Sequence, residues 1–303
     1  MKQQTLSKIY SFSGKGLHTG KFAHMQICPA PVGTGIRFIR TDLPKVDGKE
    51  AYVDAVAANV SKTARSTTIS NGKASVCTIE HLLSALTGLG VDNAYVRIDG
   101  PEVPILDGSA KLFAEAIAAD GTVEQELDRQ WIAIDKTIEY TDPKTGSWIR
   151  IEPYDGLSYE STIDFNSKVL GVQTVKWTPA GDYVKGLAPC RTFCFLHEIF
   201  GMLMMGLVKG GDVHNAIVIA EKPVSDFKLR LMEKMMHQPR LKIKSDGYLS
   251  NVDLHFPDEC GRHKMLDLIG DMRLCGGFLK AKITAYKPGH RVNTTVAQMI
   301  NKK

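Results

Sequence analysis

The chain has 303 residues, of which 43% are hydrophobic and 23% charged, and its formal net charge is +5. This composition is typical of a soluble protein with one large domain or two compact ones. No stretch reaches the length of a transmembrane helix, and residues 1–13 lack the apolar core of a secretory signal, so we expect neither.

The positive charge is concentrated in one segment. Between Lys222 and Ser245 there are seven basic residues and two acidic ones, an excess of five that equals the net charge of the whole chain. A local basic patch suits an anionic substrate or a peripheral contact with a membrane surface, and it argues against general nucleic-acid binding. A solvated helical excursion is the favoured alternative.

The six cysteines show no CxxC pair and no spacing typical of a disulfide framework. We therefore expect reduced thiols in a cytoplasmic protein and no cysteine-rich structural zinc site.

The first part of the chain alternates strand and helix patterns. Strands are predicted at 22–28, 34–40 and 91–98, and a helix is predicted after Ser109, which follows a turn. The polar stretch 119–129 is the best candidate for a domain boundary. We place the first domain at residues 1–126 and the second at 127–303.

A helix over residues 75–88 carries the first candidate site. Its apolar stripe is formed by Ile79, Leu82, Leu83 and Leu86, with Thr78 as a plausible N-cap. His81 points away from this stripe and Glu80 lies at its edge. The pair can straddle a metal ion near the helix start, with His81 as a ligand and Glu80 as a carboxylate base. The alternative is an ordinary core histidine.

The second part repeats the mixed pattern. Strands are predicted at 131–140, 148–152 and 215–220, and a helix runs from Phe193 to about residue 205. The segment 91–96 aligns faintly with 213–218. We infer an α+β fold of two similar domains from an internal duplication, each a sheet packed on helices, with the active site at the domain interface.

The helix 261–271 gives the strongest signal. His263, Asp267 and Asp271 are spaced i, i+4 and i+8, so they form one stripe that can hold a metal ion. Met265 and Leu268 belong to the opposite, core-facing side, and we expect the polar stripe not to be buried. A solvated His–Asp pair is the alternative.

His290 follows a strand at 281–285 and a Pro-Gly turn. A histidine on such a loop is free to serve as a general acid, although an ordinary surface histidine is the simpler interpretation.

Several motifs occur together and in order along almost the whole chain. They are 16–20 (GLHTG), 80–82 (EHL), 91–93 (VDN), 102–109 (EVPILDGS), 191–193 (RTF), 263–267 (HKMLD) and 284–290 (TAYKPGH). Together they resemble the UDP-3-O-acyl-N-acetylglucosamine deacetylases, zinc enzymes that perform the committed step of lipid A synthesis in Gram-negative bacteria. The resemblance implies hydrolysis of a linear amide C–N bond with release of acetate.

The resemblance also implies roles for individual residues. His81, His263 and Asp267 would bind one zinc ion per chain, and Glu80 would be the general base. Two histidines and one carboxylate suit Zn²⁺, although Fe²⁺ accepts the same ligand set.

Four further residues complete the implied catalytic set. His290 would be the general acid that protonates the leaving amine, and Asp271 would orient it. Thr192 would help to stabilise the oxyanion, and Lys264 would contact the substrate.

The 3-O-acyl chain of such a substrate requires an apolar channel. The methionine-rich segment 199–208 is the candidate, and 61–72 would lie near its mouth. The predicted substrate and channel residues are His18, Phe193, Ile199, Met202, Val208 and Val213.

One part of the chain departs from the family pattern. The stretch from His214 to His263 is longer than expected, which makes about 222–245 a basic insertion. In some bacteria this deacetylase is fused to a 3-hydroxyacyl-carrier-protein dehydratase, so the chain could be part of such a fusion.

Two other functions compete with the deacetylase. One is a zinc amidohydrolase that acts on another acylated or nucleotide-sugar amide, and the other is a non-catalytic acyl-nucleotide carrier. A carrier has no need of a base and an acid around a metal, which argues against the second.

Overall fold

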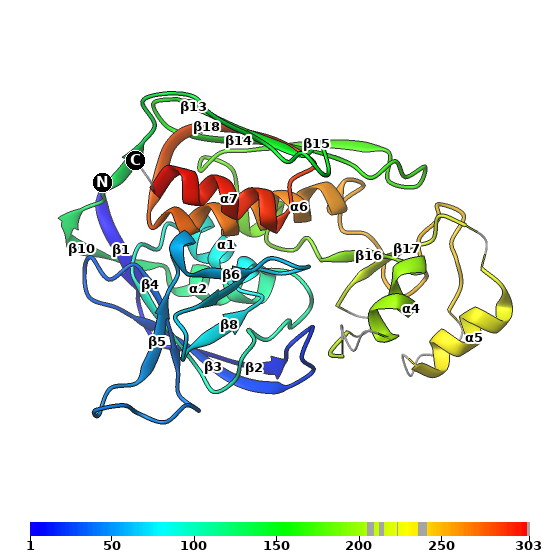
Figure 1. The fold of residues 1–303 in the computed structure, drawn as a ribbon, viewed down its shortest axis with the longest axis horizontal. Coiled ribbons are helices and arrows are strands. Elements are labelled where there is room, and N and C mark those ends of the chain that lie inside the picture. The colour runs from blue at the N-terminus through cyan, green and yellow to red at the C-terminus, as the bar shows by residue number, and fades with distance from the viewer. Residues whose placement is uncertain (205–208, 212–214, 223, 236–240, 302–303) are drawn as a thin grey trace.

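The computed structural model describes residues 1–204, 209–211, 215–222, 224–235 and 241–301. Two β-sheets form the outer layers, and helices are packed between them (Figure 1). The first sheet has the strand order β2 (Tyr10–Lys15), β3 (Phe22–Pro29), β9 (Ala94–Ile98), β4 (Ile36–Arg40), β5 (Ala51–Asp54).

The second sheet is built from later parts of the chain. Its order is β12 (Ile138–Thr141), β13 (Trp148–Pro153), β18 (Phe278–Tyr286), β14 (Leu157–Asp164), β15 (Val172–Trp177), and β11 (Trp131–Ala133) pairs in parallel with the start of β18.

The two sheets have the same topology. The central strands β9 and β18 each pair antiparallel with the second strand of one hairpin and parallel with the first strand of another. Helices α1 (Glu80–Gly88) and α6 (Glu259–Met272) precede these central strands, and α2 (Lys111–Asp120) and α7 (His290–Asn301) follow them. This correspondence confirms the duplicated α+β fold.

The repeat was aligned on the wrong strand. The described part of the segment 213–218 overlaps β17 (Ile217–Ile219), which pairs in parallel with β16 (Phe193–Phe195) in a separate two-stranded sheet. The true counterpart of β9 is β18. The short likeness in sequence reflects two buried strands with similar apolar content. The helix expected from Phe193 also begins later, because β16 precedes α4 (Leu196–Met204).

The helices α1 and α6 pack against each other at the centre of the molecule (Figure 1). Residues 80–87 of α1 are all buried, and the helices approach closely at Gly270. A Cβ atom at Gly270 would lie 2.1 Å from the carbonyl oxygen of Glu80. Only glycine permits this contact, which brings the polar stripe of α6 beside Glu80 and His81.

Smaller elements complete the fold. Strand β1 (Lys2–Leu6) pairs with β10 (Thr122–Asp128), so the predicted domain boundary after residue 126 falls inside β10. The remaining elements are η1 (Ala57–Asn59), a small sheet of β6 (Val60–Lys62), β7 (Thr68–Ser70) and β8 (Ser75–Cys77), α3 (Tyr183–Gly186), α5 (Asp226–Met235) and η2 (Arg273–Cys275). Among the described residues, no helix is long and apolar enough to cross a bilayer.

A buried ion pair fixes the start of α6 to the loop that leads into β16. The Glu259 side chain is fully buried and accepts hydrogen bonds from the Arg191 backbone at 3.0 Å and from the Arg191 guanidinium Nε at 2.9 Å. It also accepts one from the backbone of His255 at 2.6 Å. Burial would raise the pKa of Glu259, but hydrogen bonds from Arg191 hold it below its ordinary value.

We expect the Glu259→Ala variant to lose about 3–5 kcal/mol of unfolding free energy, because the Arg191 charge would remain buried without a partner. Urea unfolding measures this change. The exposed Glu126 gives a matched control, and Glu126→Ala should stay within about 0.5 kcal/mol of wild type. Equal stability of the two variants would contradict the anchoring role.

Candidate metal centre and acid–base site

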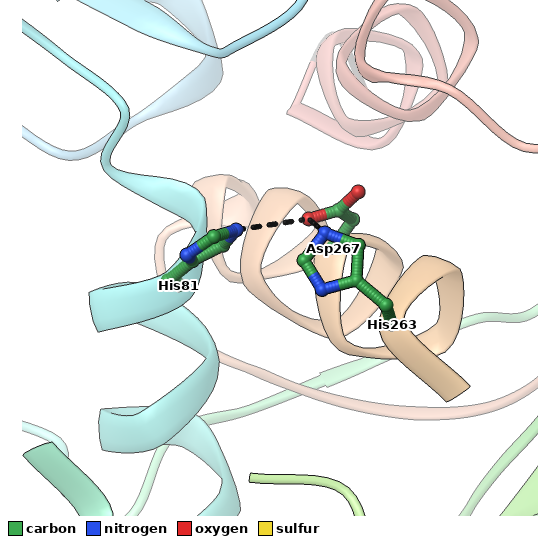
Figure 2. Close-up of side chains that lie close together, drawn as sticks. All are labelled: His81, His263 and Asp267. Carbon is green, nitrogen blue, oxygen red and sulfur yellow. Dashed lines mark ion pairs between the residues drawn. The ribbon is translucent and has the colours of Figure 1, made fainter. Parts of the chain in front are cut away.

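Three side chains that could bind a metal meet between α1 and α6. Figure 2 shows His81 on one helix pointing toward His263 and Asp267 on the other. Their ligand atoms lie within 4.8 Å of one another. The Nε2 atoms of His81 and His263 lie 3.7 and 3.6 Å from Oδ1 of Asp267, and the two rings are almost perpendicular.

The chemistry of these atoms fits a divalent metal. Burial lowers the pKa of His81 to about 3 and also lowers that of His263, so both imidazoles are neutral, as ligands must be. Oδ1 of Asp267 is buried and has no hydrogen-bond partner among the described residues. Nδ1 of His263 donates to the carbonyl of Cys190 at 3.1 Å, which leaves Nε2 to face the cluster. Two neutral imidazoles and an unpaired carboxylate oxygen match the donors that Zn²⁺ prefers.

Lys264 lies beside the cluster. Its Nζ donates to Oδ2 of Asp267 at 2.7 Å. Burial alone would raise the pKa of Asp267, but the charge of Lys264 holds it well below its usual range, so the carboxylate is ionised. The other carboxylate oxygen of Asp267, Oδ1, faces His81 and His263.

A second cluster of titratable groups adjoins the first. Nε2 of His290 lies 3.9 Å from Oε1 of Glu80, and Nδ1 of His290 donates to Oδ2 of Asp271 at 2.9 Å. Asn293 donates to the same Asp271 oxygen at 2.9 Å. These groups are well placed for proton transfer to and from a bound molecule.

The pKa values of Glu80 and His290 are both raised above their ordinary values. Burial raises the pKa of Glu80 to about 7. Burial would lower the pKa of His290, but the carboxylates of Asp271 and Glu80 outweigh it and raise the value to about 9. Near neutral pH the site therefore holds a carboxylate able to accept a proton beside an imidazolium able to donate one.

Both clusters open into one cavity of about 290 Å³. Thr192, Lys264 and His18 line it together with the clustered residues. Its apolar lining consists mainly of Leu17, Phe165, Phe193, Phe195 and Ala216. Arg65 and Glu198, both partly exposed, also line the cavity and form an ion pair at 3.3 Å. The cavity thus combines polar reactive groups with an aromatic wall, as a ligand with polar and apolar parts would need.

The structure corrects three expectations about local geometry. The stripe of His263, Asp267 and Asp271 is buried, because α1 covers it and the stripe faces other polar groups. His290 is the first residue of α7, not a loop residue. Thr78 is not the N-cap of α1: it has φ +59°, and its hydroxyl donates to Glu102 at 2.8 Å, while Ile79 occupies the cap position.

The predicted substrate and channel residues are only partly brought together. His18 and Phe193 line the cavity, whereas Ile199 is buried in an apolar cluster with Leu196 and Val218. The side chain of Met202, and the whole of Val208 and Val213, lie outside the described residues.

Sequence reasoning did not identify several individual residues at the site, although two of them, Arg65 and Thr67, lie in the segment 61–72 that was expected near the channel mouth. Arg65 and Phe165 line the cavity, and Thr67 contacts both Glu80 and Asp271. Thr67 stands in a polar run with no periodicity that would mark it out. Glu102 lies within a quoted motif, and its four hydrogen bonds hold Thr78 and the backbone and side chain of residues 18–19.

Comparison with known proteins adds an independent line of evidence. The family model described as UDP-3-O-acyl N-acetylglycosamine deacetylase matches residues 3–238 and 237–302. A protein named UDP-3-O-acyl-N-acetylglucosamine deacetylase from a Nostoc species is 36% identical over 304 residues, which is 99% of this chain and 98% of that protein.

Other relatives are longer. The bifunctional enzyme LpxC/FabZ of Porphyromonas gingivalis is 40% identical over 302 residues, and that of Bacteroides thetaiotaomicron is 38% identical over 303 residues. Each match covers all of this chain, which spans only 64% and 65% of the length of these two proteins.

Proposed function

Because this chain belongs to the UDP-3-O-acyl-N-acetylglucosamine deacetylase family, we propose that it hydrolyses the acetamide of UDP-3-O-acyl-N-acetylglucosamine and releases acetate. This reaction is the committed step of lipid A biosynthesis. The observation that carries the proposal is the pairing of a His–His–Asp cluster with Glu80 and His290 in one partly apolar cavity.

We propose that His81, His263 and Asp267 hold one Zn²⁺ per chain. A zinc ion bound there supplies a Lewis acid that polarises the amide carbonyl and acidifies water. The unpaired Oδ1 of Asp267 and the two neutral imidazoles support this choice of ligands.

The chain's own residues carry the proton transfers. Glu80 takes a proton from the attacking water as the new C–O bond forms at the acetamide carbon. His290, held by Asp271, gives its proton to the glucosamine nitrogen as the C–N bond breaks. The products are acetate and a free amine. Thr192 is proposed to donate to the developing oxyanion and Lys264 to contact the substrate, since both line the cavity.

The aromatic wall gives a direct test of the substrate class. We expect the 3-O-acylated UDP-sugar to be deacetylated at least ~100 times faster than its non-acylated analogue, since burying several CH₂ groups stabilises the bound state by roughly 0.8 kcal/mol each. The measurement is kcat/KM for acetate release from both compounds. Equal values would favour the alternative, a zinc amidohydrolase acting on another acylated or nucleotide-sugar amide.

Three accompanying proposals concern context. The first is a division into domains 1–126 and 127–303 with the site between them, supported by the repeated topology and testable by limited proteolysis.

The second is fusion to a 3-hydroxyacyl-carrier-protein dehydratase, supported by the names and lengths of the bifunctional relatives and testable from the mass of the native protein. The third is a cytoplasmic location, supported by six free cysteines and testable by cell fractionation.

We also propose a peripheral contact between the basic insertion at about 222–245 and an anionic membrane. Lys222, Arg230 and Lys234 are exposed, and α5 lies at the far end of the molecule from the N-terminus (Figure 1). Co-sedimentation with vesicles containing anionic lipid tests this contact, and salt-independent or absent binding would contradict it.

A further inference from the structure

Thr67 lies outside the implied catalytic set but forms hydrogen bonds with two of its members. It is fully buried and immediately precedes β7, at the end of the turn that connects β6 to β7. Its hydroxyl donates to Oδ1 of Asp271 at 2.6 Å, and its backbone N–H donates to Oε2 of Glu80 at 3.1 Å. One residue therefore contacts the partner of the general acid and the general base.

The two contacts are made to particular oxygens. His290 uses Oδ2 of Asp271 and faces Oε1 of Glu80, whereas Thr67 binds Oδ1 of Asp271 and Oε2 of Glu80. On each carboxylate, Thr67 therefore binds the oxygen that points away from His290. The oxygen that points toward His290 stays available to the imidazole. The Asp271 carboxylate is hydrogen-bonded at both oxygens and so cannot rotate freely. The Glu80 carboxylate is hydrogen-bonded by Thr67 at Oε2, which restricts the direction in which Oε1 points toward His290, 3.9 Å away.

We propose that Thr67 is a positioning residue that holds the carboxylates of Glu80 and Asp271 in the orientation that lets them act with His290. The inference rests on the proposed function for its kinetic consequences. It reaches across the fold, because Glu80 and Thr67 belong to the first sheet–helix repeat and Asp271 and His290 to the second.

The position of Thr67 is itself set by the preceding turn. Arg65 has φ +63°, a left-handed conformation that a non-glycine residue adopts at a cost of about 1 kcal/mol or more. The hydroxyl bond to Asp271 ties this turn to α6. If the Thr67 hydroxyl were removed, Oδ1 of the buried Asp271 would lose its hydrogen bond from Thr67. The turn could then relax and move the Thr67 backbone N–H away from Glu80.

The test compares Thr67→Val, which removes only the hydroxyl at similar volume, with Thr67→Ser, which restores it. We expect Thr67→Val to lower kcat by roughly 10–100-fold with KM within about twofold and metal content unchanged. Thr67→Ser should recover most of kcat. The adjacent, half-buried Thr68 gives the control Thr68→Val, which should leave kcat near that of wild type.

A double-mutant cycle separates positioning from general loss of stability. If Thr67 acts through Asp271, adding Thr67→Val to Asp271→Asn should lower kcat by much less than it does in wild type. Full additivity, or an unchanged kcat in Thr67→Val, would overturn the proposal. So would a Thr67→Ser variant as impaired as Thr67→Val.

A readout without substrate keeps this test distinct from that of the deacetylase activity. The proton between His290 and Asp271 should give a downfield ¹H NMR resonance, absent in His290→Ala. We expect it to shift or broaden in Thr67→Val and to return in Thr67→Ser, even if the substrate assignment fails. An identical resonance in wild type and Thr67→Val would overturn the positioning role, whereas no acetate release by wild type would overturn only the proposed function.

Discussion

The Glu80→Gln variant should release acetate roughly 10²–10⁴ times more slowly than wild type, the range that a positioned general base contributes. Glutamine keeps the size of the side chain and can still accept from the Thr67 backbone, but its amide cannot take a proton from water. Glu80 is not one of the three clustered ligand residues, so bound metal should be unchanged. Single-turnover acetate release and metal analysis of the same sample measure both.

The control for this variant is Glu126→Gln, because Glu126 is exposed on β10 and is not among the residues that line the cavity. It should retain wild-type kcat. If Glu80→Gln formed acetate at an unchanged rate, Glu80 would not be the base and the proposed proton transfers would be wrong.

The His263→Ala variant should lose metal and activity together. The side chain supplies one of three ligand atoms within 4.8 Å, and its replacement leaves only one histidine and one carboxylate. We expect metal content to fall from about one ion per chain to near zero after dialysis, and acetate release to fall at least as far as in Glu80→Gln. Metal analysis beside the activity assay makes the comparison.

His24 provides the matched control, because it is an exposed histidine on β3, outside the cavity. The His24→Ala variant should keep both metal and activity. Circular dichroism of His263→Ala excludes unfolding as the cause, and full metal occupancy in a folded His263→Ala variant would remove His263 from the ligand set.

The helices that carry the metal cluster could be predicted because their signals are local. The i, i+4, i+8 spacing of His263, Asp267 and Asp271 lies within one helix, and α6 is observed where this periodicity placed it. The burial of that stripe could not be predicted, because it depends on the packing of α1 on α6 at Gly270.

The sheet topology and the positioning contacts are non-local. Strand β13 pairs with β18 more than a hundred residues later, and Thr67 reaches Asp271 across 204 positions of sequence. A single polar residue in a short excursion has no periodicity, so its role appears only once the chain is folded. The misaligned repeat has the same origin, since likeness over six residues says nothing about strand partners.

The central claim is metal-dependent deacetylation at the His81, His263 and Asp267 cluster. Its most direct test is acetate release from UDP-3-O-acyl-N-acetylglucosamine by wild-type protein as isolated, after removal of metal with a chelator, and after stoichiometric Zn²⁺ is restored. We predict activity that disappears with the metal and returns at about one Zn²⁺ per chain. Acetate release that persists in metal-free protein, or zinc-loaded protein that releases none, would contradict the account.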